Sequence, residues 1–140
     1  MNLKAITAAA MLTLAAGAAH ATVLHFGAAL KGASEVPPNA TAGRGELTAD
    51  LDTDTKTLTY HVTYVGLTGP ATGAHFHGPA APGVDAPVVI AAKDPASPID
   101  GSAQLTDAQI ADLKGGKWYF NVHTKATPAG EIRGQLKRNF

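Results

Sequence analysis

The stretch that decides the fold class is Thr57-Leu58-Thr59-Tyr60-His61-Val62-Thr63-Tyr64-Val65. β-Branched and aromatic side chains dominate it, and these side chains fit the surface of a pleated sheet. Residues 50–54 before it and residues 66–73 after it contain the Asp, Gly, Thr and Pro that favour turns. The stretch is therefore predicted to be a β-strand.

Similar short runs, separated by turn residues, recur along the rest of the chain. Strands are predicted at residues 23–30, 46–51, 74–78, 87–91, 118–123 and 131–137. One short helix is predicted to begin at Thr106-Asp107-Ala108-Gln109, which has the spacing of a capping box, and to end at Gly115-Gly116. Seven or eight strands at this spacing predict an all-β fold, an antiparallel β-sandwich or flattened Greek-key barrel with one short helix.

The N-terminus has the three parts of a signal peptide. Lys4 supplies a positive start, an apolar run follows at residues 5–16, and Ala19-His20-Ala21 fits an A-x-A cleavage site. The apolar run is shorter than the roughly 20 residues that a transmembrane helix needs. Residues 1–21 are therefore predicted to be removed, leaving one exported domain at residues 22–140 that is periplasmic or secreted and has no membrane anchor.

Charge and cysteine content exclude several classes of partner and chemistry. The chain has eleven basic and eleven acidic residues, and removal of Lys4 with the signal peptide leaves ten basic residues, a net charge of about −1 with neutral histidine. No basic cluster is present, so neither nucleic acid nor an anionic membrane surface is expected as a partner. Cysteine is absent, which removes disulfides, thiolate nucleophiles and thiolate metal ligands.

Two of the histidines outside the signal peptide lie two residues apart on a predicted strand. Alternation along a strand places His75 and His77 on one face, with Phe76 on the opposite face toward the core. A turn centred on Gly69 would place His61 directly opposite His77. A register slip of one residue would break that pairing.

The same alternation applies to the aromatic strand near the C-terminus. Its phenylalanine faces inward, so Asn121 and His123 are predicted on the outer, polar face. A turn centred on Thr127 would pair His123 with Glu131 and Asn121 with Arg133. Both predicted hairpins therefore carry metal-capable side chains outside the core.

Grouped imidazoles have an evident chemical use. A set of three or four histidines without thiolates suits Cu(II) or Zn(II). The alternative is that these are ordinary histidines that make hydrogen bonds at the surface. The predicted metal ligands are His75, His77 and His123, with His61 as a candidate fourth, and the residues expected around them are Glu131, Arg133 and Asn121. Glu131 is expected to orient a ligating ring through a hydrogen bond.

Several segments resemble the CHRD (chordin) domain family, in the same order along the chain. They are Gly73-Ala74-His75-Phe76-His77-Gly78-Pro79-Ala80, Tyr119-Phe120-Asn121-Val122-His123-Thr124 and Pro128-Ala129-Gly130-Glu131-Ile132-Arg133-Gly134-Gln135-Leu136, with residues 30–38 and 43–45 resembling the opening of the family. Two residues depart from the family pattern: Phe76 replaces a more usual aliphatic residue, and His61 lies where no histidine is required. The resemblance implies a secreted β-sandwich, of the kind found in bacterial single-domain members, and implies little about activity.

Three functions remain open. The first is an exported metal-binding protein, with copper as the favoured ion. The second is a metal-free structural or partner-binding module, whose protein partner the sequence does not identify. The third is a copper-only enzyme similar in outline to copper–zinc superoxide dismutase, in which Arg133 would attract an anion to the metal. It is less favoured because the loop at residues 79–87 offers only Asp85 and no histidine for a zinc site, and because no disulfide is available.

Overall fold

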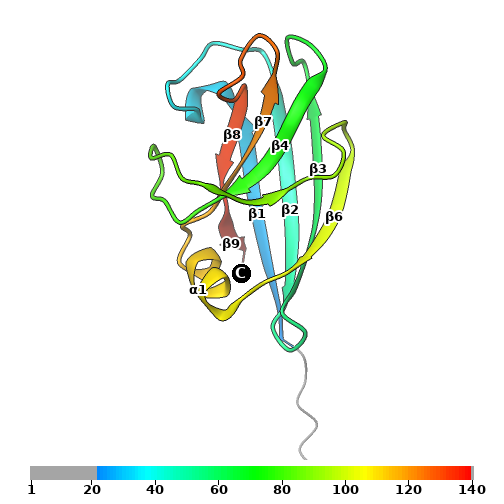
Figure 1. Cartoon of the computed structure of the whole chain (residues 1–140), viewed down its shortest axis with the longest axis vertical. Coiled ribbons are helices and arrows are strands. Elements are labelled where there is room, and N and C mark those ends of the chain that lie inside the picture. The colour runs from blue at the N-terminus through cyan, green and yellow to red at the C-terminus, as the bar shows by residue number, and fades with distance from the viewer. Residues whose placement is uncertain (1–21, 140) are drawn as a thin grey trace, which may run out of the picture.

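The computed structural model describes residues 22–139 (Figure 1). The predicted signal peptide, residues 1–21, lies outside the described residues. The strands are β1 (Val23–Lys31), β2 (Arg44–Asp52), β3 (Thr57–Val65), β4 (Ala71–His77), β5 (Val88–Ala91), β6 (Ile99–Gln104), β7 (Tyr119–Thr124), β8 (Ile132–Gln135) and β9 (Lys137–Asn139). A single 3₁₀ turn, η1 (Gly32–Ser34), and one α-helix, α1 (Asp107–Lys114), complete this part of the chain.

Each predicted strand is present, with two differences. The strand β6 was not predicted, because Ile99-Asp100-Gly101-Ser102-Ala103-Gln104 is poor in the residues that favour strands. The segment predicted as one strand at 131–137 is divided at Leu136, whose main-chain N–H donates to the carbonyl of Trp118. Beyond this point the chain leaves β7 and pairs with β1 as β9.

The predicted helix is confirmed together with its caps. The Thr106 hydroxyl accepts a hydrogen bond from the main-chain N–H of Gln109 at 3.2 Å, and the Gln109 side chain accepts one from Thr106 N–H at 2.9 Å. The helix ends at Gly115 and Gly116, the latter with a φ of 69° that favours glycine. Within residues 22–139, neither helical segment has the length and apolarity needed to cross a bilayer.

All strand pairs are antiparallel, and the sheet runs in the order β5-β4-β7-β8-β1-β2-β3-β6. This single sheet folds over on itself, so that β4 crosses the strands β1 to β3 (Figure 1). Tyr60 on β3 packs edge-on against Phe76 on β4, with ring centroids 4.9 Å apart, so these two strands face each other across the core. The all-β prediction of a sandwich or flattened barrel with one short helix is confirmed.

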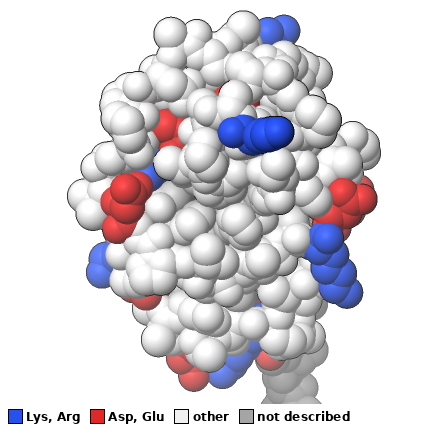
Figure 2. Space-filling model, turned by 45° about the horizontal axis from the view of Figure 1, so that its top comes forward, with Lys and Arg blue, Asp and Glu red and all other residues white. Residues whose placement is uncertain are grey.

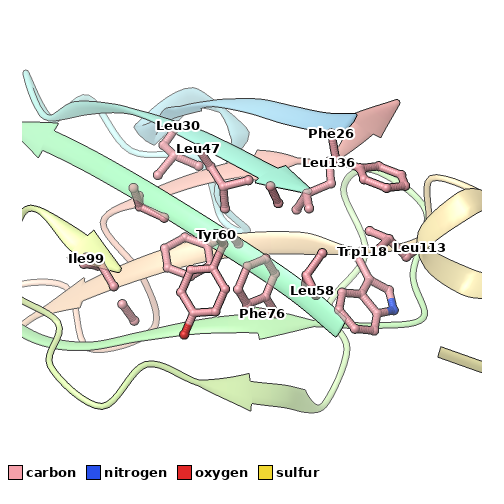
Figure 3. Packing of buried hydrophobic residues seen from close by; sticks show 14 of the residues in the cluster. Phe26, Leu30, Leu47, Leu58, Tyr60, Phe76, Ile99, Leu113, Trp118 and Leu136 are labelled. Atoms are coloured by element: carbon pink, nitrogen blue, oxygen red, sulfur yellow. The ribbon is translucent and has the colours of Figure 1, made fainter. Parts of the chain in front are cut away.

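The core lies between the two layers and contains large side chains from both (Figure 3). Phe76 packs against Phe120, with ring centroids 4.8 Å apart, and Trp118 lies beside them toward α1. Each of these three side chains is at most 1 % exposed. Because the inward side chains of β4 and β7 are fixed by this packing, the alternate side chains on both strands must point to the outer surface.

Charged side chains on the face seen in Figure 2 are scattered, with both signs interspersed and wide uncharged areas between them. No single-sign patch is visible on that face. Its appearance agrees with the near-zero net charge of the chain.

Candidate metal centre

The pairing of β4 with β7 brings three histidines together. In this ladder Gly73 lies opposite His123 and His75 lies opposite Asn121. His77 occupies the next outward position on β4. The predicted outward orientation of all three rings is confirmed, although they meet through the β4–β7 ladder and not through the hairpins expected from the sequence.

The nitrogen atoms of this histidine cluster lie close together, and two of them have a spacing that suits ligands of a single ion. His75 Nδ1 is 3.0 Å from His123 Nε2. One ring nitrogen from each of His75, His77 and His123 lies within 4.8 Å of the others. Two nitrogen ligands bound at about 2.0–2.1 Å lie roughly 3 Å apart when the angle at the metal is near 90°. The His75–His123 pair therefore already has the spacing of two adjacent ligands.

Main-chain carbonyls fix the tautomers of two rings. His123 Nδ1 lies 2.9 Å from the Pro128 oxygen, and His77 Nδ1 lies 2.9 Å from the Ala86 oxygen. A carbonyl oxygen only accepts, so each Nδ1 carries the hydrogen and donates it. Nε2 of His123 then keeps its lone pair, which is the usual arrangement of a metal-ligating histidine. Nε2 of His77 faces a second acceptor, the side-chain oxygen of Asn121, so the contacts of this ring do not leave Nε2 as a free lone pair.

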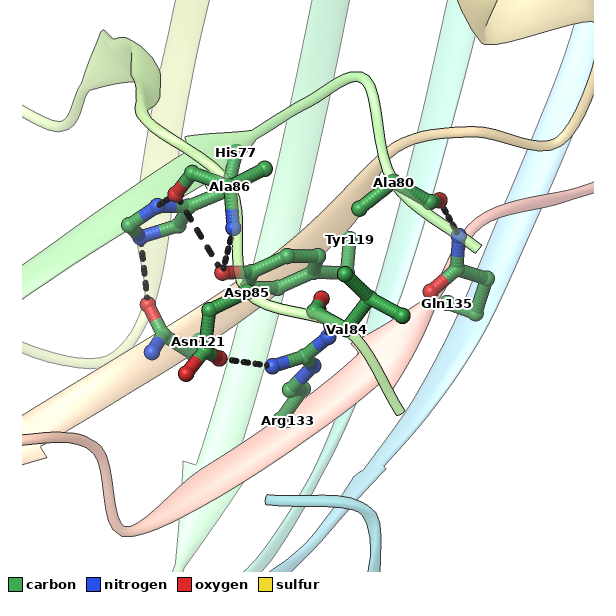
Figure 4. Close-up of polar contacts among 9 residues, drawn as sticks. All are labelled: His77, Ala80, Val84, Asp85, Ala86, Tyr119, Asn121, Arg133 and Gln135. Atoms are coloured by element: carbon green, nitrogen blue, oxygen red, sulfur yellow. Dashed lines mark hydrogen bonds and ion pairs between the residues drawn. The ribbon is translucent and has the colours of Figure 1, made fainter. Parts of the chain in front are cut away.

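The second nitrogen of His77 is not free. Its Nε2 lies 3.0 Å from Oδ1 of Asn121, which is itself 3 % exposed (Figure 4). Asn121 was predicted to lie beside the ligands, and it does. For His77 Nε2 to bind an ion, this contact with the amide must be replaced by the metal bond.

The electrostatic surroundings keep two of the rings neutral. Burial lowers the pKa of His75, and the nearby His123 and His77 rings lower it further because like charges disfavour protonation. Burial also lowers the pKa of His123, against the opposing effect of the Pro128 carbonyl. Neutral imidazole is the form that binds a metal ion, so neither ring has to lose a positive charge near pH 7. The hydrogen that His75 Nδ1 donates to His123 Nε2 must move to the other ring nitrogen if Nδ1 is to bind the ion.

The loop at residues 79–87, which we call the strap, covers the outer face of β7 and β8. The Arg133 guanidinium donates to Asp85 Oδ1 at 2.8 Å and to the Val84 carbonyl (Figure 4). It also lies 3.4 Å above the ring of Tyr119, which stacks on His77 at a centroid distance of 4.7 Å. The strap thus turns a face that was predicted to be open into a buried layer.

The prediction for Arg133 needs correction in consequence. Its pairing opposite Asn121 is confirmed. However, only 2 % of the residue is exposed, and its ion pair is with Asp85, not with Glu131 two residues away. A guanidinium held in this way under the strap does not present its charge to an incoming anion.

The prediction that His61 faces His77 is wrong. β3 pairs with β2 and β6, where His61 lies opposite Thr48 and Asp100. Its Nδ1 lies within hydrogen-bond distance of Asp100 Oδ1, at 2.7 Å, on the exposed face of the other layer. The link at residues 66–70 carries the chain from one layer to the other and does not close a hairpin. His61 is not part of the histidine cluster.

The role predicted for Glu131 is also wrong. The β7–β8 ladder ends at the pair Val122–Ile132, one step before His123 and Glu131, and no hydrogen bond joins these two residues. Glu131 is fully buried, and its carboxylate accepts hydrogen bonds from threonines at the end of β7 and in three separate loops. The donors are the hydroxyls of Thr41, Thr68, Thr124 and Thr127 and the main-chain N–H of Thr68.

These hydrogen bonds dominate the ionisation of Glu131. Burial alone would raise its pKa, but the hydroxyl donors of Thr124, Thr41 and Thr68 lower it to about 2. Sequence inspection missed Thr41 and Thr68 because they lie 90 and 63 residues before Glu131. It missed Thr124 and Thr127 because nothing in the local sequence marks them as partners of a buried carboxylate. We call this group the Glu131 network, and it fixes the loops at one end of the sheet.

Comparison with known proteins gives one family match, which covers nearly the whole domain. The model of the family described as the CHRD domain matches residues 26–136. This range contains the histidine cluster, the strap and the Glu131 network. No curated protein and no solved structure shows a significant match.

Proposed function

The chain belongs to the CHRD domain family, and we propose that this member binds one copper(II) ion through His75, His77 and His123. The observation that carries the proposal is the convergence of three ring nitrogens within 4.8 Å on two neighbouring strands. We further propose that the domain acts in the periplasm or outside the cell, on the strength of the signal-peptide pattern at residues 1–21.

The donor set favours copper or zinc over other ions. All three ligands are imidazoles, which suit both ions, whereas magnesium and calcium prefer oxygen ligands. At a given nitrogen site, divalent copper binds more tightly than zinc. The two carbonyl contacts that orient His77 and His123 support the same assignment, because ligand rings that are already fixed lose little freedom on binding.

Binding alone, without turnover, is the function that the geometry supports best. The enzyme hypothesis required Arg133 beside an open position of the metal, and Arg133 instead anchors the strap to β8. The experiment that tests metal binding also tests the hypothesis of a metal-free module.

We expect the metal-free domain to bind copper(II) with one-to-one stoichiometry and sub-micromolar affinity in calorimetry, with weaker binding of zinc. The His75→Ala/His77→Ala variant should lose more than the roughly 10–100-fold in affinity that removal of a residue supporting a ligand costs. Electron paramagnetic resonance of the copper-loaded protein should show hyperfine coupling to nitrogen, and this coupling should disappear in the variant.

The matched control is His25→Ala/His61→Ala. These two histidines are exposed, and each is paired with an aspartate on the other layer, so removing them should leave the affinity unchanged. Equally weak heats for all three proteins would contradict the proposal and support the metal-free module. A loss of affinity in the control alone would place the ion on the other layer.

A further inference from the structure

A second concave site lies on the outer face, separate from the histidine cluster. A pocket of about 500 Å³ opens between residues 33–38 and the strap residues Pro82 and Gly83, over Arg133 and Gln135 of β8. We call it the β8 pocket. Its volume is within the range of roughly 300–1,000 Å³ that is usual for small-molecule sites, and no histidine lines it.

Glu35 in the wall of this pocket has an unusual environment. The residue is 3 % exposed, and its Oε1 is buried without a hydrogen-bond partner. Gly130, at a φ of 136°, lies against the carboxyl group, and a Cβ added there would overlap Oε1. Among the described residues Glu35 forms no ion pair, because Arg133 is paired with Asp85. A buried carboxyl oxygen without a hydrogen-bond partner is rare and calls for an explanation.

The polar groups around Glu35 leave acceptors in excess in the β8 pocket. Arg133 donates to Asp85 and to the Val84 carbonyl. The side-chain nitrogen of Gln135 donates to the carbonyls of Ala80 and Gly116, so its oxygen remains as an acceptor (Figure 4). Asp85 lies beside the pocket and is paired with Arg133, so with Glu35 ionised the carboxylate of Glu35 is the charge that no ion pair balances. The complementary ligand is therefore a cation that donates hydrogen bonds.

We propose that the β8 pocket binds a primary alkylammonium group, with the ammonium on the Glu35 carboxylate. The remaining wall suits an alkyl chain, because it consists of small and apolar side chains. These are Ala33, Ser34, Val36, Pro38, Pro82 and Gly83, of which only Ser34 carries a polar side chain. The proposal goes beyond metal binding and does not depend on it, since none of the groups it uses belongs to the histidine cluster.

The ionisation of Glu35 provides an independent test. Burial raises the pKa of Glu35 to about 7, and Asp85 adds to this effect, while Arg133, the Val36 main chain and Asn121 oppose it. An ammonium ion needs the ionised carboxylate, so binding should strengthen as the pH rises through 7. For a pKa of about 7, the ionised fraction rises about tenfold between pH 6 and pH 8, and the affinity should rise by the same factor.

The experiment is a titration of the metal-free domain with n-butylammonium chloride, followed by ¹H–¹⁵N NMR at pH 8 and pH 6. We expect saturable shifts at residues 33–38 and 82–83, with a dissociation constant on the order of 1 mM, as is usual for a ligand of this size. Glu35→Gln keeps the shape of the side chain and removes its charge, and it should weaken binding at least tenfold at pH 8.

Two controls make the result decisive. Glu46→Gln removes an exposed carboxylate from β2 and should not change the affinity. Neutral n-butanol has nearly the same shape as the probe and should bind at least tenfold more weakly. The proposal is overturned if the wild-type protein shows no saturable shifts, if Glu35→Gln binds equally well, or if butanol equals butylammonium. The dispersion of the ¹H–¹⁵N spectrum of Glu35→Gln shows whether the variant is folded, and this control does not depend on copper binding.

Discussion

Replacing Glu131 with glutamine is expected to lower the free energy of unfolding at pH 7 by about 3 kcal/mol. The carboxylate accepts from four threonine hydroxyls in a fully buried position, and its pKa of about 2 lies well below the ordinary value of 4.5. An amide of the same shape offers only one oxygen acceptor. Its two N–H hydrogens point at hydroxyl groups, which must then rotate so that they accept a hydrogen bond and no longer donate one. The Glu131 network would lose its charge-assisted hydrogen bonds without creating a cavity.

The effect of this substitution should depend on pH in a defined direction. Because the pKa of Glu131 is lower in the folded than in the unfolded protein, its stabilisation is complete above about pH 4.5 and is lost as the pH falls toward 2. Urea unfolding of both proteins at pH 7 and at pH 3 would measure this. A difference in stability that stays the same at both pH values would show that the charge of Glu131 is not the cause. Glu46→Gln, at an exposed position, is the control and should change stability by less than about 0.5 kcal/mol.

Replacing Gly134 with alanine is expected to cost at least about 3 kcal/mol, enough to prevent folding of a marginally stable domain. Gly134 lies opposite Phe120 in β8, at the place where β8 closes against β1. A Cβ built at this position overlaps the main-chain oxygen of Ala29 and approaches Leu30 Cδ2 to 2.9 Å. Since the first obstacle is backbone, relief requires the two strands to move apart, and side-chain rotation cannot supply it.

The matched control for this prediction is Gly69→Ala. A Cβ at Gly69 meets nothing within 4 Å, so its cost should be below about 1 kcal/mol. Thermal unfolding of the purified proteins, together with the yield of folded material, would compare the two variants. If Gly134→Ala unfolds within a few degrees of Gly69→Ala, β8 and β1 are not held as closely as their contact indicates.

Local pattern predicted the orientation of the side chains in the histidine cluster. Alternation with a period of two follows from strand geometry alone, and Phe76 identified which side of β4 is the inner one. The pairing of strands could not be predicted in the same way. A link rich in Gly and Pro is chemically the same whether it closes a hairpin or carries the chain between layers, so His61 was placed opposite His77 although it lies on the other layer.

The burial of side chains on the outer face could not be predicted from the sequence pattern either. Arg133 was correctly placed opposite Asn121, but nothing in a strand pattern shows that a distant loop will cover it. The strap does so through Asp85 and Val84, about 48 residues earlier in the chain. The partners of Glu131 were missed for the same reason, since the contacts that decide its role come from the end of β7 and from three loops.

The two strands that carry the histidine cluster become neighbours only when the sheet assembles. His75 and His123 are 48 positions apart, so an unfolded chain offers an ion only the pair His75 and His77. An ion that binds all three rings therefore acts as a reversible cross-link between β4 and β7. By mass action, an ion at 1,000 times its dissociation constant would add about 4 kcal/mol to the stability of the folded state. The concentration of free copper around the domain would then determine the stability of its folded state. The bound ion would stabilise the fold as a disulfide does in other small domains.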